Sequence, residues 1–210
     1  MKKLGLIMAG LAIMATSACT STKVTSSWRR NDAQQLQKDQ KIMVMALVPA
    51  KDRALRSQME TYTVSELRKK GYNAVSALKE YGPQQFGKMG EKQVVSKLQG
   101  SDVNQVMTIV MLDKGREKNY VPGYMYQPYG YYGFWPYYSS WYSRMYAPGG
   151  YITYSTKYQW EGNLYDLQSG KLLYSVQSRS FDPPTTERMA VLYAQEVVKD
   201  MGKRQLLTNN

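Results

Sequence analysis

Histidine is absent from this sequence of 210 residues, and cysteine occurs once, at position 19. Histidine is the most common general base in enzymes and the most common ligand of transition metals. A single cysteine can form neither an internal disulfide nor a cysteine-rich zinc site. The composition therefore excludes Ser-His-Asp and Cys-His catalysis, and zinc sites built from these residues. We expect no cofactor and no bound metal, and catalysis would have to use carboxylates, lysine, serine or tyrosine.

The sequence also lacks an apolar run at its start that is long enough to span a membrane. Residues 4–15 form an apolar run of twelve residues, whereas a bilayer core of about 30 Å needs about 20. Lys2 and Lys3 precede this run, and the small residues 16–18 follow it. This order is typical of a signal peptide, which we predict to cover residues 1–18 and to be removed.

Cys19 directly follows the small residues, as the lipid-bearing cysteine does in bacterial lipoproteins. The stretch resembles a lipobox, so we predict that Cys19 carries diacylglyceryl and acyl groups such as palmitate. Ordinary cleavage after Ala18, which would leave a free thiol, is the alternative. Thr20 and Ser21, with no aspartate next to the cysteine, resemble the sorting pattern for the outer membrane. We therefore expect an outer-membrane protein that is anchored by lipid and faces the periplasm.

Acidic residues are few compared with basic ones: 16 against 28, which gives a formal net charge of +12. A basic, exported protein would meet anionic lipid, cell-wall polymer or acidic envelope proteins. Basic charge with many aromatics can also indicate nucleic acid binding, but export makes that partner unexpected. A solvated basic surface without any partner fits the same composition.

Apolar runs that alternate with helical patterns predict one α/β domain. The run 41–48 reads as a strand covered on both faces, and 105–112 as a second one. The pattern predicts a mixed sheet of five or six strands, with a βαβαβ unit, then a β-hairpin and a C-terminal helix, and helices mainly on one face. We expect strands at 23–28, 41–48, 72–76, 105–112, 152–167 and 171–181, and helices at 52–70, 91–99 and from 182–184 to 203.

The domain organisation follows from these elements. After the signal peptide, residues 19–40 are expected to form a lipidated tether and an edge strand. Residues 41–204 form the α/β domain, and 205–210 a loose tail. A Tyr-rich insertion at 120–151 interrupts the domain, and its prolines and glycines forbid a long helix or an uninterrupted central strand.

The Tyr-rich insertion is the best candidate for a contact surface. Tyrosine and tryptophan offer large faces that stack on sugar rings, contact peptides or lie at a membrane interface. An arginine can add a cation over an aromatic ring. The insertion could equally fold back over its own sheet, or be a variable loop. The candidate binding residues are Tyr124, Tyr126, Tyr129, Tyr131, Tyr132, Trp135, Tyr137, Tyr138, Trp141, Tyr142 and Arg144.

The order of segments also resembles a known group of proteins. The stretches VTSSW, KIMVMALV, GYNAVSALKEYGP, VMTIVMLDKGREKNYVPG and KYQWEGNLYDLQSGKLLYSVQSRSFDPP, with the insertion and the last helix, resemble a family of uncharacterised bacterial envelope lipoproteins. The resemblance implies a location and a fold but no activity. More remotely, the architecture is similar to small α/β domains of periplasmic lipoproteins that regulate cell-wall synthases, and to the N-terminal domain of the Tol-system periplasmic protein.

Three weaker patterns could indicate chemistry. Ser76 and Lys79 have the Ser-x-x-Lys spacing of serine acyl enzymes, but the companion motifs are not recognisable. Asp113 and Glu117 follow a predicted strand, where ligand sites gather in parallel sheets. Glu161 and Asp166 lie at odd spacing on one strand and so cannot form a close pair, and the glycines at 87 and 90 lack the spacing of a phosphate loop.

The sequence thus favours a non-enzymatic lipoprotein that faces the periplasm and binds cell-wall polymer or an envelope protein through its aromatic insertion. The alternative is a hydrolase or transferase that acts on an envelope polymer through carboxylates near Asp113 and Glu117. A third possibility is a structural lipoprotein whose insertion only rests on lipid.

Overall fold

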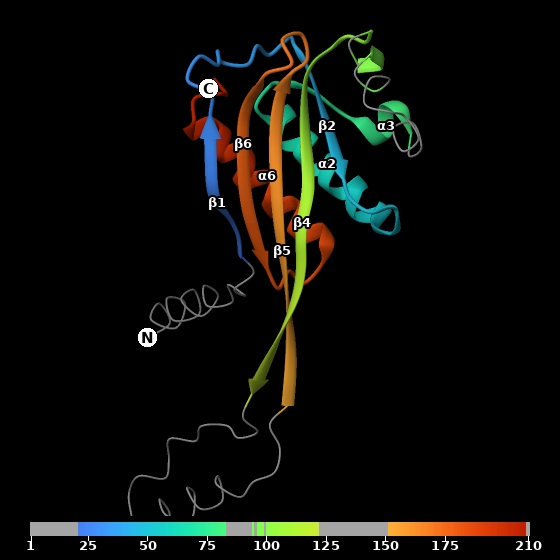
Figure 1. Cartoon of the computed structure of the whole chain (residues 1–210), viewed down its shortest axis with the longest axis vertical. Coiled ribbons are helices and arrows are strands. Elements are labelled where there is room, and N and C mark those ends of the chain that lie inside the picture. Colours follow the sequence, from blue (N-terminus) through green and yellow to red (C-terminus); the bar gives the residue numbers. More distant parts are fainter. Residues whose placement is uncertain (1–20, 83–93, 95, 99, 122–150, 209–210) are drawn as a thin grey trace, which may run out of the picture. The chain divides into compact units, whose positions relative to one another are not determined.

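Six strands form one mixed sheet in the order β1-β6-β5-β4-β2-β3 (Figure 1). The structure, a computed structural model, describes residues 21–82, 94, 96–98, 100–121 and 151–208. Strand β2 runs parallel to β3 and β4, whereas β6 is antiparallel to β1 and β5. The prediction of a mixed α/β sheet is confirmed. The strands are β1 (Ser21–Arg29), β2 (Lys41–Leu47), β3 (Asn73–Ser76), β4 (Val103–Val121), β5 (Tyr151–Asp166) and β6 (Leu172–Phe181).

The long helices α2 (Arg53–Lys69) and α6 (Thr186–Lys203) cover the same face of the sheet, behind the strands in Figure 1. Helix α6 begins where the Thr185 hydroxyl accepts a hydrogen bond from the Arg188 amide at 3.0 Å, as an N-cap does. Helix α2 ends before Gly71, whose φ of 85° is a left-handed conformation that favours glycine. The short helices are η2 (Ala50–Asp52) and α3 (Ala77–Tyr81).

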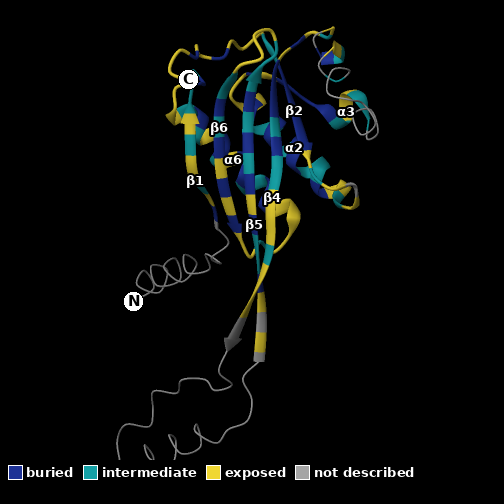
Figure 2. Ribbon diagram, viewed as in Figure 1, coloured by how far each residue is buried: buried dark blue, intermediate teal, exposed yellow. Residues whose placement is uncertain are grey.

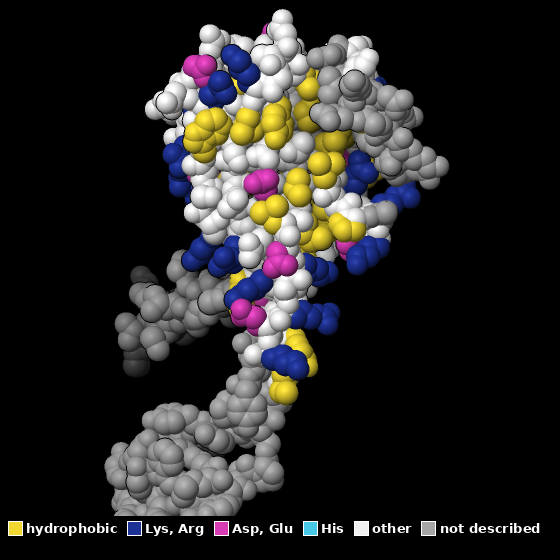
Figure 3. Space-filling view, viewed as in Figure 1, with side chains coloured by type: hydrophobic (Ala, Val, Ile, Leu, Met, Phe, Trp, Pro, Cys, Tyr) yellow, Lys and Arg dark blue, Asp and Glu magenta, His cyan; other side chains and the backbone are white. Residues whose placement is uncertain are grey.

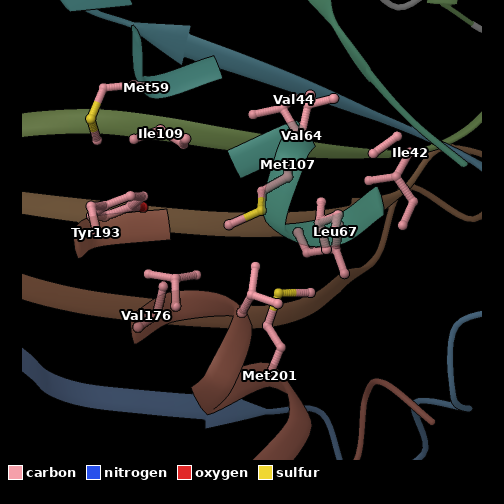
Figure 4. Packing of buried hydrophobic residues seen from close by; sticks show 14 of the residues in the cluster. Ile42, Val44, Met59, Val64, Leu67, Met107, Ile109, Val176, Tyr193 and Met201 are labelled. Atoms are coloured by element: carbon pink, nitrogen blue, oxygen red, sulfur yellow. The ribbon is translucent and has the colours of Figure 1, made fainter. Parts of the chain in front are cut away.

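The main core lies between the sheet and the two long helices. Ile42 and Val44 from β2 meet Leu67 from α2, and Figure 4 shows Met107, Tyr193 and Val176 in the same layer. A second, smaller core contains Met43, Met45, Val75 and Val106. Adjacent residues of β2 therefore enter different cores, which confirms that this apolar run is covered on both faces.

Strands β3 and β4 also contribute residues to both cores, whereas β6 has one buried face only. On β6, Tyr174, Val176, Ser178 and Ser180 are buried, while Gln177 and Arg179, which alternate with them, are exposed (Figure 2). This alternation is expected of a strand with helices on one side and no helix on the other. The face of β1, β6 and β5 that points away from α2 and α6 is called the open face below.

Strand β4 is longer than the sequence predicted. The apolar pattern ends at Leu112, but the strand continues to Val121. Residues 112–114 and 116–118 are exposed, so the usual alternation of buried and exposed positions is missing there. The described residues fall into two compact units, 1–114 with 157–210 and 115–156, and the second holds the end of β4 and the start of β5.

The prediction of a loose tail at 205–210 is wrong for its described part, because Leu206 and Leu207 are buried in the main core and the Leu36 amide donates to the Leu206 carbonyl at 2.9 Å. The remaining predicted helix agrees in type where it can be compared. Of the helix expected at 91–99, residues 94 and 96–98 are described, and they are helical. Two hydrogen bonds join β4 to β5: the Leu167 amide donates to the Asn104 carbonyl at 2.9 Å, and the Thr108 hydroxyl to the Asn163 carbonyl at 3.4 Å. Their numbers run in opposite directions, so this pair is antiparallel.

Candidate binding surface

Several predicted site residues lie outside the described residues. Cys19, its signal peptide and the glycines at 87 and 90 are among them. So is the whole set of aromatic candidates with its arginine, within residues 122–150. The structure does describe the strand ends from which that segment departs and the strand that follows the cysteine. These positions define where both segments join the sheet.

The register of the strands aligns these two joining points. Ser21, the first residue of β1, is opposite Phe181 at the end of β6, and Phe181 is in turn opposite Lys157 on β5. The sequence reaches Ser21 two residues after Cys19. Lys157 is the residue at which β5 enters the larger unit, and β4 leaves that unit after Lys114. The tether and the root of the Tyr-rich segment therefore meet the sheet at the same end, called the tether end below.

The tether end carries basic side chains. Lys23 is directly opposite Arg179, and in the described part of the chain neither side chain has a salt bridge. Like charges that face each other across strands are destabilising. The Lys157 ammonium lies 5.5 Å from the centroid of the Phe181 ring, and Phe181 is 36% exposed. This end therefore combines positive charge with a partly exposed aromatic ring.

The open face carries apolar side chains as well. Trp28 on β1 is 47% exposed, and on β4, the strand next to β5, Leu112 is 49% exposed. Figure 3 shows hydrophobic side chains scattered over this face among polar ones. Scattered exposed apolar residues are usual on protein surfaces and need no binding partner to explain them.

The Ser-x-x-Lys pattern is a helix cap and part of a buried network. The Ser76 hydroxyl donates to the Glu60 carboxylate at 2.6 Å and accepts from the Lys79 amide at 3.2 Å. Ser76 is only 6% exposed, and Glu60 is fully buried. The carboxylate of Glu60 also accepts from the Ala46 amide and the Leu78 amide, and Arg56 pairs with it at 3.1 Å. The Ser76 hydroxyl is thus buried, and it both donates and accepts a hydrogen bond within the fold. A nucleophile needs a hydroxyl that a substrate can reach.

The other carboxylates that the sequence singled out either accept hydrogen bonds within the fold or are exposed within a strand. Asp166 accepts hydrogen bonds from the Ser169 amide at 2.7 Å and from its hydroxyl at 2.5 Å, which closes the β5–β6 turn. Glu161 accepts from Asn163 at 3.2 Å. Asp113 and Glu117 do not follow the end of a strand, as the sequence had suggested, because both are exposed residues within β4.

Metal-ligand clusters and membrane-spanning helices are both missing from the described residues. No group of three or more Asp, Glu or Cys side chains there is arranged to hold a metal ion. No helix in the described part of the chain has the length and hydropathy needed to cross a membrane.

The pairs of residues at the tether end are features that the sequence did not predict. Lys23 and Arg179 are separated by more than 150 positions, and no local pattern links them. Only the pairing of the first strand with the last one brings them together. A correct pairing of β1 with β6 would have been the one signal able to find them.

No protein-family model matches the sequence, and no curated protein does. Solved structures with a similar arrangement include the PelC dodecamer from Paraburkholderia phytofirmans, with 12% identity, a TM-score of 0.44, and coverage of 91% of this chain and 99% of that chain. Lipoprotein GNA1162 from Neisseria meningitidis has 17% identity, a TM-score of 0.44, and coverage of 78% and 99%.

A third similar structure is a putative neuraminyllactose-binding hemagglutinin homolog from Helicobacter pylori, with 8% identity and a TM-score of 0.39. It is matched over 85% of this chain and 94% of that chain. Similarities this remote say nothing about what the present protein binds or does.

Proposed function

We propose that this protein is a lipoprotein of the bacterial outer membrane that faces the periplasm, and that it has a non-catalytic role in the cell envelope. In this proposal, lipid on Cys19 anchors the chain, and the Tyr-rich segment contacts cell-wall polymer or an envelope protein. The observation that carries the proposal is the alignment of Ser21, Phe181 and Lys157 at one end of the sheet.

This alignment links the anchor to the contact segment. With Cys19 in the membrane, β1 begins after a single intervening residue, so the tether end of the sheet lies near the lipid head groups. The basic pair Lys23 and Arg179 would then meet anionic head groups, each basic residue near such a surface contributing about 1 kcal/mol. The strands that lead to the Tyr-rich segment, β4 and β5, cross from the larger unit into the second one at this same end, which supports the proposed link between anchor and segment.

A non-catalytic role is supported by what the reactive groups do. Ser76, Glu60 and Asp166 are all used in hydrogen bonds that hold the fold together. The carboxylate alternative required groups that converge at a strand end, and Asp113 and Glu117 do not lie at one. We therefore do not propose an enzymatic activity.

The anchor is tested by the C19S variant. We expect the wild-type protein to carry acyl groups in intact-protein mass spectra and to remain with outer membranes after fractionation. C19S should lack the added mass and leave the membrane fraction. Acylation of neither protein, with equal fractionation, would contradict the proposed anchor.

The contact segment is tested by co-sedimentation of the lipidated protein with purified cell-wall sacculi and with liposomes. The test variant has residues 122–150 replaced by an Asn-Gly turn, and a matched variant keeps the length but has Ser in place of every Tyr and Trp of that segment. We expect both variants to lose capture by sacculi while their melting temperatures match that of the wild type.

The outcomes separate the candidate roles. Retention on liposomes without capture by sacculi would favour the structural role, in which the segment rests on lipid, and the basic tether end is the observation in its favour. Unchanged capture by both variants would contradict the role of the segment. Turnover of a cell-wall substrate that persists through purification would contradict the non-catalytic role.

A further inference from the structure

A groove lies between the last turns of α2 and α6, at the other end of the sheet from the tether. Its volume is about 630 Å³, and its lining includes Lys70, which directly follows α2, and Lys199 and Lys203 from α6. The chain just after α6 reaches the far part of β1, since the Arg204 guanidinium donates to the Ser27 hydroxyl at 2.9 Å. Ser21 and Ser27 are six residues apart, which is about 20 Å along a strand. We call this hollow the α2–α6 groove.

The groove has an apolar base and a basic rim. Val198 and Leu207 both line it, and each is only 3% exposed. Among the described lining residues the one carboxylate is Glu66, and the Lys69 ammonium already pairs with it at 2.6 Å. Lys199 contacts Glu196 at 3.8 Å in an exposed pair, which is worth little. The groove therefore presents positive charge above an apolar surface.

Lysines are favoured at helix C-termini because they complement the helix dipole, an effect of about 0.3–1 kcal/mol. The helix dipole thus accounts for the lysines at these helix ends, but it does not account for the groove between them. Gly202 lines the groove inside α6, and a Cβ added there would meet no atom within 4 Å. Glycine within a helix costs about 0.5–1 kcal/mol relative to alanine. The helix thus lacks a side chain at a position where one would fit and would partly fill the groove.

We infer that the α2–α6 groove binds a short peptide rich in carboxylates and small apolar side chains, the chemistry of cell-wall stem peptides. Lysine ammoniums on flexible stems can follow carboxylates at varied spacing. The apolar base can receive methyl groups such as that of alanine. This inference rests on the proposed function for the source of the ligand, and it names the part of the cell-wall polymer that is recognised.

The position of the groove favours this ligand over the head groups of the anchoring membrane. The groove is about 20 Å along the sheet from the residue that follows the tether. Charges in solution are screened over about 8 Å at physiological salt. An anionic partner at this end therefore comes from the periplasmic space.

The experiment is a calorimetric titration of the full mature chain with a soluble disaccharide–tetrapeptide fragment of the cell wall. We expect binding that weakens at least tenfold for the double variant K70E/K203E and weakens as salt is raised. The same fragment with amidated carboxylates should bind at least tenfold more weakly than the natural one. K171E, which reverses an exposed lysine in the β5–β6 turn, serves as the matched charge control and should bind like the wild type.

A second variant separates binding from stability. G202L fills the groove without changing its charge, and we expect weaker binding together with an unchanged or higher melting temperature. Binding of the fragment by both G202L and K70E/K203E with the affinity of the wild type would overturn the inference. So would tight binding to a hexaglutamate peptide without binding to the wall fragment, or binding to anionic vesicles that K70E/K203E abolishes.

Failure here and failure of the proposed function give different results. If the fragment does not bind but residues 122–150 still govern capture by sacculi, the groove inference fails alone. If the fragment binds but Cys19 is not acylated, the proposed anchor fails and the groove assignment stands.

Discussion

The two faces of the sheet are built from the same strands but are covered differently. On the helix face, Trp160 and Tyr174 are fully buried beneath α6, whereas on the open face Trp28 is 47% exposed. The buried face also holds polar groups, and among them the Glu60 carboxylate and the Tyr174 hydroxyl bond to specific neighbours. Large aromatic side chains therefore contribute to stability on one face and are available for contact on the other.

Glu60 should show the largest effect on the helix face. E60A removes a buried carboxylate that accepts a hydrogen bond from the Ser76 hydroxyl and pairs with the Arg56 guanidinium. Both groups then lose this partner. Removing one partner of a buried pair costs about 3–5 kcal/mol, so we expect chemical denaturation to show a loss of this size. E66A on the same helix is the control, and a loss above about 1 kcal/mol there would break the contrast.

Tyr174 should show a smaller effect that depends on pH. Its hydroxyl donates to Asp200 at 2.7 Å, and removal of a hydrogen bond to a charged group costs about 1.5–3 kcal/mol. Burial and this bond raise the pKa of Tyr174 above its ordinary value of 10.0. The unfolded chain ionises above pH 10.0 while the folded chain stays protonated, so this contribution falls as pH rises further.

The measurement for Tyr174 is urea denaturation of the wild type and Y174F between pH 8 and pH 11. The difference in free energy of unfolding should be constant below pH 9.5 and narrow above pH 10. A difference that widens at high pH would contradict the assigned bond.

Gly162 should reveal the close packing under α6. A Cβ at this position would lie 2.7 Å from the Tyr193 hydroxyl oxygen and 3.0 Å from Val176 Cγ1. We expect G162A to cost about 1–3 kcal/mol, as overpacking does. In the described part of the chain the Tyr193 hydroxyl has no hydrogen-bond partner, so Y193F should be tolerated and should relieve part of this cost.

A thermodynamic cycle of G162A and Y193F measures this coupling. G202A is the control, because a Cβ there meets no atom within 4 Å and the helix should gain stability. Additive effects of G162A and Y193F would show that the hydroxyl is not the obstacle.

Trp28 should show the smallest effect, because it lies on the open face. We expect W28A to change the free energy of unfolding by about 0.5 kcal/mol or less, as surface substitutions usually do. Urea denaturation of the isolated mature chain checks this. A large loss would mean that the open face contributes to the core, which would break the comparison between the faces.

Local patterns were sufficient to predict much of the fold. Strand β2 was predictable because both of its faces are apolar, and α2 because Leu55, Met59 and Leu67 recur on one side. The end of β4 was not predictable, because its charged residues are exposed and the alternation that marks a strand is lost. Strand formation there depends on pairing with β5, which no local pattern reports.

The candidate site depended on distant pairs and was correspondingly harder to predict. Ser76 matched an enzyme pattern in sequence, and only its bond to Glu60 identifies it as a cap. The tether end arises from the pairing of Ser21 with Phe181 and of Phe181 with Lys157. Neither pairing follows from residues that are neighbours in the sequence.

The pairing of β1 with β6 also has a consequence for the order of folding. Thr22 shares a hydrogen bond with Ser180, 158 positions later, whereas the bonds of Glu60 span 4 to 18 positions. During synthesis the N-terminal part of a chain emerges first, and local contacts form before distant ones. Strand β1 therefore stays unpaired until most of the chain has been synthesised. Strand β6 then completes the sheet by pairing with it.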